Sequence, residues 1–135
     1  MAEPGGSAPT DPLTGLPNRR HLERYLAALT GRGDRAMVGT VDLDGLSQVN
    51  AAHGRLAGDL VLQRVGGVVA RILRRGDFVA RAGGDEFVVV LTGASGAQAA
   101  EVARRITEAV AAEEWEALVP GTRISVTVTW RSVPD

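Results

Sequence analysis

The sequence predicts an α/β (α+β) fold, a ferredoxin-like, palm-type sandwich in which helices cover an antiparallel sheet. Three observations predict it. Segments with helical periodicity alternate with short apolar runs, in the order helix, strand, helix, hairpin, helix, strand. A glycine pair joins two of the apolar runs, which is typical of a β-hairpin. The final run alternates apolar and polar residues, as a half-buried strand does.

The first helix is expected to start after Asn18, whose side chain can accept a hydrogen bond from the first turn. Its apolar residues recur at helical spacing along one face: Leu22, Tyr25, Leu26 and Leu29. The polar and glycine-containing residues 31–34 end this helix. Residues 36–43 then form a buried strand, and that strand ends in the triplet Asp42-Leu43-Asp44.

A second helix is predicted over residues 58–75, although Gly66 and Gly67 inside it each cost about 1 kcal/mol relative to alanine. Its apolar residues share one face: Val61, Val65, Val68, Val69 and Ile72. The third helix carries a similar apolar face: Ala99, Val102, Ile106 and Val110. The last strand alternates its apolar residues with polar ones: Ile124, Val126, Val128 and Trp130.

The segment Arg81-Ala82-Gly83-Gly84-Asp85-Glu86-Phe87 lies between two apolar runs and is the most informative part of the chain. Both turn positions of such a hairpin can require positive φ, which glycine adopts without strain. The tip therefore displays Asp85 and Glu86 on a stiff support. We expect Asp42 and Asp44 to lie near them, which places four carboxylates together. Such a group either takes up protons or binds divalent cations, and hard oxygen ligands favour Mg²⁺ or Mn²⁺.

Composition narrows the class of protein. The 135 residues suit one domain, and a hydrophobic fraction of 44% is ordinary for a globular protein. No apolar stretch approaches the roughly 20 residues of a transmembrane helix, and the absence of cysteine favours a cytoplasmic protein. A net charge of −1 gives no basic surface for nucleic acid. Residues 1–10 are expected to be a disordered stub, and residues 11–135 a single domain.

Four segments in order resemble the GGDEF domain of the diguanylate cyclase family. Residues 11–20 are similar to the family pattern DxLTGLxNRR. The next segment is similar to DxDxFKxxND and GHxxGD, and it contains Asp42-Leu43-Asp44, Asn50, Gly54, Gly58 and Asp59. Arg74-Arg75-Gly76-Asp77 stands at the place of the RxxD site, and the signature itself is Gly83-Gly84-Asp85-Glu86-Phe87. The resemblance extends over residues 11–130. Singly, each residue has a plainer reading: Asn50 as a helix cap, Asp59 as a favourable charge at a helix start, Arg74 and Asp77 as a surface pair, Arg81 as a partner of a nearby acid.

The resemblance implies an enzyme that condenses two GTP molecules into the bacterial second messenger cyclic di-GMP. It implies that Asp42, the carbonyl of Leu43 and Asp85 hold Mg²⁺ or Mn²⁺ ions. Asp85 or Glu86 would be the general base. Two pairs of residues would bind the nucleotide: Asn50 and Asp59 at the guanine base, Gly83 and Gly84 at the phosphates. Two further implications are an inhibitory site for cyclic di-GMP at Arg74 and Asp77, and a homodimer that brings two GTP molecules together.

Several departures from the family pattern predict weak activity. Leu46-Ser47 replaces a phenylalanine-lysine pair, which removes a phosphate-binding cation, and Arg55 stands where a histidine is usual. The chain is also expected to lack the family's last helix and strand, which carry a Lys-x-x-Gly-Arg segment. Two alternatives therefore stay open. One is an inactive domain that senses cyclic di-GMP or GTP through the RxxD site, and the other is a structural or interaction module.

Overall fold

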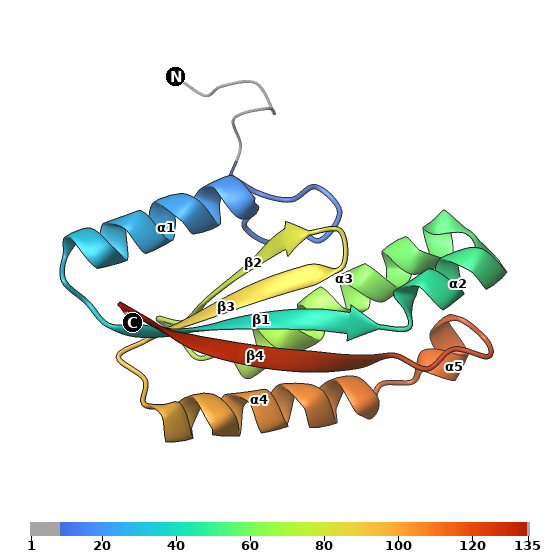
Figure 1. Cartoon of the computed structure of the whole chain (residues 1–135). Helices are drawn as coiled ribbons and strands as arrows, with labels where there is room; N and C mark the ends of the chain where they lie inside the picture. Colours follow the sequence, from blue (N-terminus) through green and yellow to red (C-terminus); the bar gives the residue numbers. More distant parts are fainter. Residues whose placement is uncertain (1–8, 135) are drawn as a thin grey trace.

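The computed structural model describes residues 9–134 and contains one antiparallel sheet in the strand order β2-β3-β1-β4 (Figure 1). The four strands are β1 (Ala36–Asp44), β2 (Phe78–Gly83), β3 (Glu86–Thr92) and β4 (Ser125–Val133). The first strand of the chain therefore lies in the interior of the sheet, between the hairpin on one side and the last strand on the other. This arrangement brings the end of β1 beside the start of β3.

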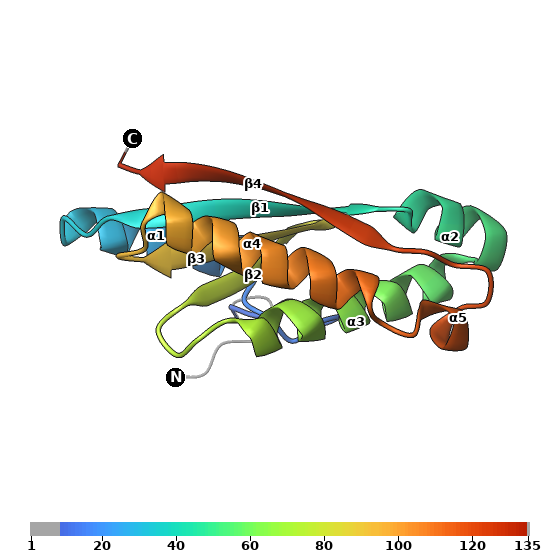
Figure 2. The same cartoon turned by 90° about the horizontal axis from the view of Figure 1, so that it is seen from below.

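Helices lie on both faces of this sheet (Figures 1 and 2). They are α1 (Arg19–Gly31), α2 (Leu46–His53), α3 (Arg55–Ile72), α4 (Gly96–Ala111) and the short α5 (Trp115–Leu118). Helices α3 and α4 pack on one face and α1 on the other, so the predicted sandwich of helices on an antiparallel sheet is confirmed. No helix within residues 9–134 has both the length and the apolarity needed to cross a lipid bilayer.

Two apolar clusters hold these layers together, because successive strand residues point to opposite faces. Val41 and Leu43 of β1 face α3 and α4, where they join a core with Phe87 and other residues that are almost fully buried. Ala36 and Val38 face α1 instead. Asp42 and Asp44 share the alternation of Val38, so they lie on the α1 side of the sheet, and both are exposed there.

The first helix, the hairpin, the third helix and the last strand occur where the sequence predicts them. Asn18 caps α1 by accepting a hydrogen bond from the His21 backbone N–H, at 3.0 Å between Oδ1 and N. Of the expected N-terminal stub, residues 1–8 lie outside the described part of the chain. Pro9 and Thr10 belong to the fold, since the Asn18 N–H donates to the Pro9 carbonyl and Thr10 pairs with Pro17.

The second predicted helix differs from the structure at both ends and omits its neighbour. It begins at Arg55 rather than at residue 58, and it ends at Ile72, because Leu73 adopts an extended conformation. Helix α2 precedes it, between Gly45 and Gly54, whose φ values of 102° and 93° allow the chain to change direction sharply. Only two residues of α2 are buried, so its periodic pattern is too short to identify from the sequence. The four-residue α5 was also not predicted.

Candidate functional site

The hairpin between β2 and β3 turns at Gly84 and Asp85, while Gly83 pairs with Glu86 in the ladder. Neither Gly83 nor Gly84 has positive φ, so the expected left-handed turn at the two glycines is wrong. A bulge between Arg81 and Gly83 shifts the register and shapes the tip instead. Side-chain hydrogen bonds then hold this shape.

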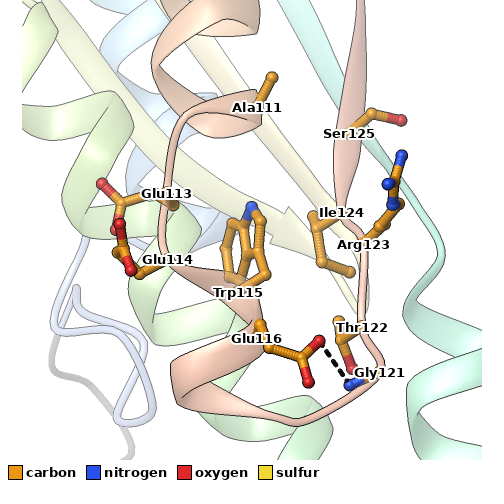
Figure 3. A pocket seen from close by; sticks show the side chains of 10 residues that line it. All are labelled: Ala111, Glu113, Glu114, Trp115, Glu116, Gly121, Thr122, Arg123, Ile124 and Ser125. Carbon is orange, nitrogen blue, oxygen red and sulfur yellow. Dashed lines mark hydrogen bonds between the residues drawn. The ribbon is translucent and has the colours of Figure 1, made fainter.

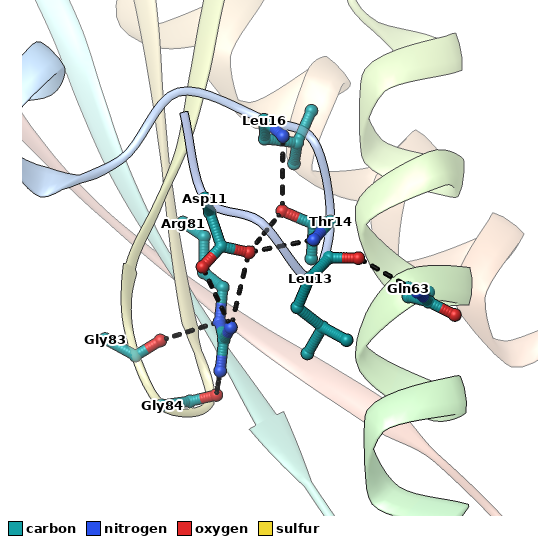
Figure 4. Close-up of polar contacts among 8 residues, drawn as sticks. All are labelled: Asp11, Leu13, Thr14, Leu16, Gln63, Arg81, Gly83 and Gly84. Atoms are coloured by element: carbon teal, nitrogen blue, oxygen red, sulfur yellow. Dashed lines mark hydrogen bonds and ion pairs between the residues drawn. The ribbon is translucent and has the colours of Figure 1, made fainter. Parts of the chain in front are cut away.

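Arg81 holds the hairpin tip through its guanidinium, which lies between Asp11 and the two glycines (Figure 4). Its Nε donates to the Gly83 carbonyl at 3.1 Å, and its Nη2 donates to the Gly84 carbonyl at 2.8 Å. Its Nη1 lies 3.1 Å from Oδ1 of Asp11, and both side chains are 16% exposed. Asp11 is 70 positions away from Arg81 in the sequence. Their contact therefore connects the N-terminal loop to the hairpin.

The Asp11 carboxylate also accepts hydrogen bonds from the Thr14 backbone N–H and hydroxyl, both at 2.8 Å (Figure 4). Burial alone would raise the pKa of Asp11. The two hydrogen bonds from Thr14 and the charge and hydrogen bond of Arg81 outweigh burial and hold the pKa below its ordinary value. Asp11 is thus a stable anion, and Gln63 of α3 adds a further tie by donating to the Leu13 carbonyl at 2.9 Å.

Asp42 and Glu86 stand directly opposite each other on β1 and β3. The Leu43 N–H donates to the Asp85 carbonyl at 3.2 Å, which makes Asp42 and Glu86 a pair without mutual backbone hydrogen bonds. In such a pair the Cα atoms lie about 4.5 Å apart and the side chains share one face. Two like charges therefore lie side by side at the edge of the hairpin tip.

Asp44 does not join this pair. Its Oδ2 accepts hydrogen bonds from the Thr127 hydroxyl at 3.2 Å and the Ser125 hydroxyl at 3.4 Å, both on β4. Within residues 9–134 no group of three or more His, Asp or Glu side chains is arranged to hold a metal ion. This corrects the expected cluster of four carboxylates. The smaller set of Asp42, Asp85 and the Leu43 carbonyl remains a prediction.

A pocket of about 490 Å³ opens between α2, α3 and the hairpin tip, a volume in the range of small-ligand sites. Four of the predicted site residues line it together: Asn50, Asp59, Gly84 and Asp85. The rest of its wall consists of Leu46, Ser47, Arg55, Gly58, Leu62 and Arg81. Residues from three separate segments of the chain thus converge on one cavity, with an amide and carboxylates among them.

Gly58 allows the α2 and α3 ends of this pocket to approach closely. A Cβ added at Gly58 would lie 1.9 Å from Oδ1 of Asn50, so no other residue fits there without moving the amide. Asn50 lies inside α2 and does not cap a helix, and Asp59 falls beyond the first turn of α3. The plainer readings of both residues, as a cap and as a first-turn charge, therefore do not apply.

The family model described as "Diguanylate cyclase, GGDEF domain" matches residues 8–130 of this chain. The chain belongs to the GGDEF family. The pocket and the hairpin of this GGDEF domain come from the segments that carry the family's motifs in the sequence.

Similar proteins include diguanylate cyclases. The chain is 40% identical over 107 residues to Diguanylate cyclase DgcP of Pseudomonas aeruginosa, a match that covers 76% of this chain and 16% of that protein. It is 32% identical over 127 residues to Diguanylate cyclase A of Treponema denticola, covering 89% of this chain and 34% of that protein. The chain therefore spans well under half the length of either relative.

Among solved structures, the GGDEF domain of DgcB from Caulobacter crescentus, in complex with c-di-GMP, superposes with a TM-score of 0.82. The alignment covers 98% of this chain and 80% of that one, at 23% sequence identity. At this identity the likeness supports the fold alone. It agrees with the mixed helical and four-stranded antiparallel architecture described above.

The RxxD residues of this GGDEF domain lie outside the pocket, in the turn between α3 and β2. The Arg74 N–H donates to Oδ2 of Asp77 at 2.9 Å, and the Asp77 N–H donates to the Arg74 carbonyl at 3.0 Å. The Arg74 guanidinium approaches the same carboxylate only to 4.0 Å, and its side chain is 74% exposed. Asp77 therefore shapes the turn, and Arg74 extends into solvent.

A larger hollow of about 1,060 Å³ lies between the end of α4, α5 and the start of β4 (Figure 3). Its lining residues include three glutamates and Trp115, whose indole N–H donates to the Val110 carbonyl at 2.7 Å. It contains none of the residues predicted for the site. Of these two hollows, the smaller one is lined by predicted site residues and the larger one is not.

Proposed function

We propose that this GGDEF domain binds GTP in the pocket between α2, α3 and the hairpin tip and condenses two GTP molecules into cyclic di-GMP. The observation that carries the proposal is the convergence of Asn50, Asp59, Gly84 and Asp85 on one cavity. Membership of the family supplies the reaction class. The two diguanylate cyclases that the chain resembles support the same choice.

Guanine recognition rests on Asn50 and Asp59, which stand on adjacent helices and both line the pocket. A carboxylate accepts hydrogen bonds only, and an amide both donates and accepts. Guanine presents N–H donors beside a carbonyl acceptor, so this pair matches its edge. Adenine presents a different order of donors and acceptors and leaves the Asn50 and Asp59 side chains without matching partners.

The phosphate end of the pocket is formed by the hairpin tip. Asp42, Asp85 and the Leu43 carbonyl are oxygen ligands of the kind that Mg²⁺ or Mn²⁺ prefers, and the like-charged pair of Asp42 and Glu86 favours a bound cation. The metal would neutralise charge on the triphosphate and acidify the attacking hydroxyl. Gly83 and Gly84 leave the tip without bulky side chains, so phosphate oxygens can approach its backbone.

Asp85 or Glu86 accepts the proton of the attacking 3′-hydroxyl in this proposal. The reaction joins two nucleotides while each pocket holds one, so two copies of the domain must face each other. Ser47 lines the pocket where the resemblance leads one to expect a lysine. One charge-assisted phosphate contact is thereby absent, at a cost of about 1.5–3 kcal/mol, and we expect slow turnover.

Incubation of the purified protein with GTP and Mg²⁺ tests the proposal through the appearance of cyclic di-GMP. We expect product from the wild type and none from Asp85→Ala, with both proteins folded by circular dichroism. Calorimetry in parallel measures GTP binding. Absence of both product and GTP binding at high protein concentration would contradict the proposal, whereas binding without product would leave an inactive GTP sensor.

A second candidate function is the sensing of cyclic di-GMP at Arg74 and Asp77. It is favoured by the Arg74 side chain, which is 74% exposed and has only a distant contact with Asp77. An exposed guanidinium is suited to bidentate contact with phosphate or with the edge of guanine. Calorimetry with cyclic di-GMP should show binding that Arg74→Ala weakens by about tenfold or more. Equal binding by both proteins would count against this site.

A further inference from the structure

Arg55 is one of two arginines that line the pocket between α2, α3 and the hairpin tip, among the residues that the structure describes. It begins α3, lines the pocket wall and is exposed. Within residues 9–134 its guanidinium makes no ion pair and no hydrogen bond. The other arginine of the pocket, Arg81, is occupied by Asp11 and by the carbonyls of the hairpin tip. A ligand in this pocket therefore meets one uncommitted guanidinium.

Arg55 and Asp59 both line the pocket and both belong to α3. The two residues are four apart on α3, so they lie one turn apart on the same side of the helix. Opposite charges at this spacing commonly pair, yet the structure records no ion pair between them among the described residues. Both groups remain available for a ligand.

We propose that Arg55 reads the O6 and N7 atoms of the guanine base, an inference that rests on the proposed GTP function. Guanine carries two adjacent acceptors, O6 and N7, on one edge, and arginine can donate to both at once. The neighbouring N–H donors of the base then face the acceptor oxygens of Asp59. Arg55 thus matches the acceptors O6 and N7, and Asp59 matches the N–H donors on the adjoining edge of guanine.

This assignment gives Arg55 a role in specificity. Adenine has an amino group where guanine has O6, so a guanidinium there meets a donor instead of an acceptor. The residue departs from the motif that the chain resembles, in which histidine is usual at this position. The alternative contact for Arg55 is a phosphate oxygen, which every nucleotide would provide equally.

Isothermal titration calorimetry with GDP and 7-deaza-GDP separates the two contacts. Both ligands lack the γ-phosphate of GTP, so neither can release pyrophosphate and the condensation does not occur during the measurement. 7-deaza-GDP differs from GDP only in lacking the N7 acceptor. We expect the wild type to bind GDP about tenfold more tightly than 7-deaza-GDP, and Arg55→Ala to bind both ligands with the same reduced affinity. Arg55→Lys, which donates without the planar fork, should keep only part of the preference. Arg20→Ala, an exposed arginine of α1 outside the pocket, is the matched control and should keep the full preference.

An equal loss of affinity for both ligands in Arg55→Ala, with the ratio between them unchanged, would mean a phosphate contact and would overturn the assignment. Unchanged binding of both ligands would overturn it as well. In either case, if Asp59→Ala abolishes GDP binding, the proposed binding of guanine nucleotides in this pocket would still be supported. A wild type that binds no guanine nucleotide would remove the proposed function and this inference together.

Discussion

The Nη1 atom of Arg81 lies 3.1 Å from the Asp11 carboxylate, in a contact where both side chains are 16% exposed. The same guanidinium holds the carbonyls of Gly83 and Gly84. One arginine therefore links the N-terminal loop to the tip of the hairpin. The positions of Asp85 and Glu86 depend on this link. Within residues 9–134, the one other side-chain hydrogen bond that supports the tip is donated by Arg19 to the Ala82 carbonyl.

Asp11→Asn should lower the free energy of unfolding by about 1–3 kcal/mol, because it removes a charge-assisted contact from a half-buried site. Chemical denaturation at neutral pH measures the change. The matched control is Asp34→Asn, since the Asp34–Arg32 pair is exposed, at 41% and 57%, and should contribute under about 1 kcal/mol. Equal small effects from both substitutions would show that the Asp11–Arg81 contact does not stabilise the fold.

The stability that Asp11 provides should depend on pH. Its pKa is lower in the folded protein than in the unfolded chain, where it is about 3.9. The contribution is therefore complete above the unfolded value and is lost as the pH falls through the folded value. We expect the stability gap between wild type and Asp11→Asn to stay constant near neutral pH and to shrink below about pH 4. A gap that persists unchanged in acid would contradict this assignment.

Gly58→Ala should weaken GTP binding by about tenfold, because the new methyl group would displace the Asn50 amide from the pocket. Calorimetry measures the affinity, and circular dichroism checks that the helices persist. Gly67→Ala is the matched control in the same helix. Its Cβ would meet only the Arg71 side chain at 3.8 Å, so it should stabilise α3 by up to about 1 kcal/mol and leave binding unchanged. If both variants bind GTP as the wild type does, Asn50 has no part in nucleotide recognition.

Local patterns in the sequence were sufficient for the hairpin, α1 and α4. The cap at Asn18 and the alternation of β4 depend on neighbouring residues, which a sequence displays directly. Helix α2 was missed because its apolar face consists of Leu46 and Val49 alone. A better signal was present in the two flanking glycines, Gly45 and Gly54, whose positive φ values mark the ends of the helix.

The site required more than local patterns. The sequence predicted that Asp42 and Glu86 would be neighbours, and the register of β1 and β3 brings them together. It could not show that Asp44 binds the hydroxyls of β4, because that contact depends on which strand lies on the other side of β1. The sequence also could not show that Asp11 is the partner of Arg81, because Asp11 reaches the hairpin only through the folded N-terminal loop.

Gly39→Ala should destabilise the protein by about 1–3 kcal/mol, because an added Cβ would lie 2.6 Å from the Trp130 ring across the β1–β4 pair. Denaturant unfolding measures the loss. Combining Gly39→Ala with Trp130→Leu should cost less than the sum of the two single changes, since the clash disappears. Gly96→Ala at the start of α4, where an added Cβ meets nothing within 4 Å, is the control and should not destabilise. Simple additivity in the double variant would show that the ring does not cause the effect.

Glu86→Gln should stabilise the metal-free protein by about 0.2–1 kcal/mol, because it removes one of two like charges that face each other across β1 and β3. Thermal unfolding in EDTA measures this gain. Mg²⁺ should then raise the midpoint of the wild type more than that of Asp42→Asn, since a cation stabilises the folded state by an amount that grows with its affinity for that state.

The control for both measurements is Glu23→Gln, which removes an exposed carboxylate on α1 and leaves the β1–β3 pair of Asp42 and Glu86 unchanged. It should change neither the stability in EDTA nor the response to Mg²⁺. A wild type that gains no stability from Mg²⁺, while Glu86→Gln is still the more stable protein in EDTA, would separate the two effects. The charges of Asp42 and Glu86 would then repel each other without forming a metal site, and the proposed condensation would lose its cation.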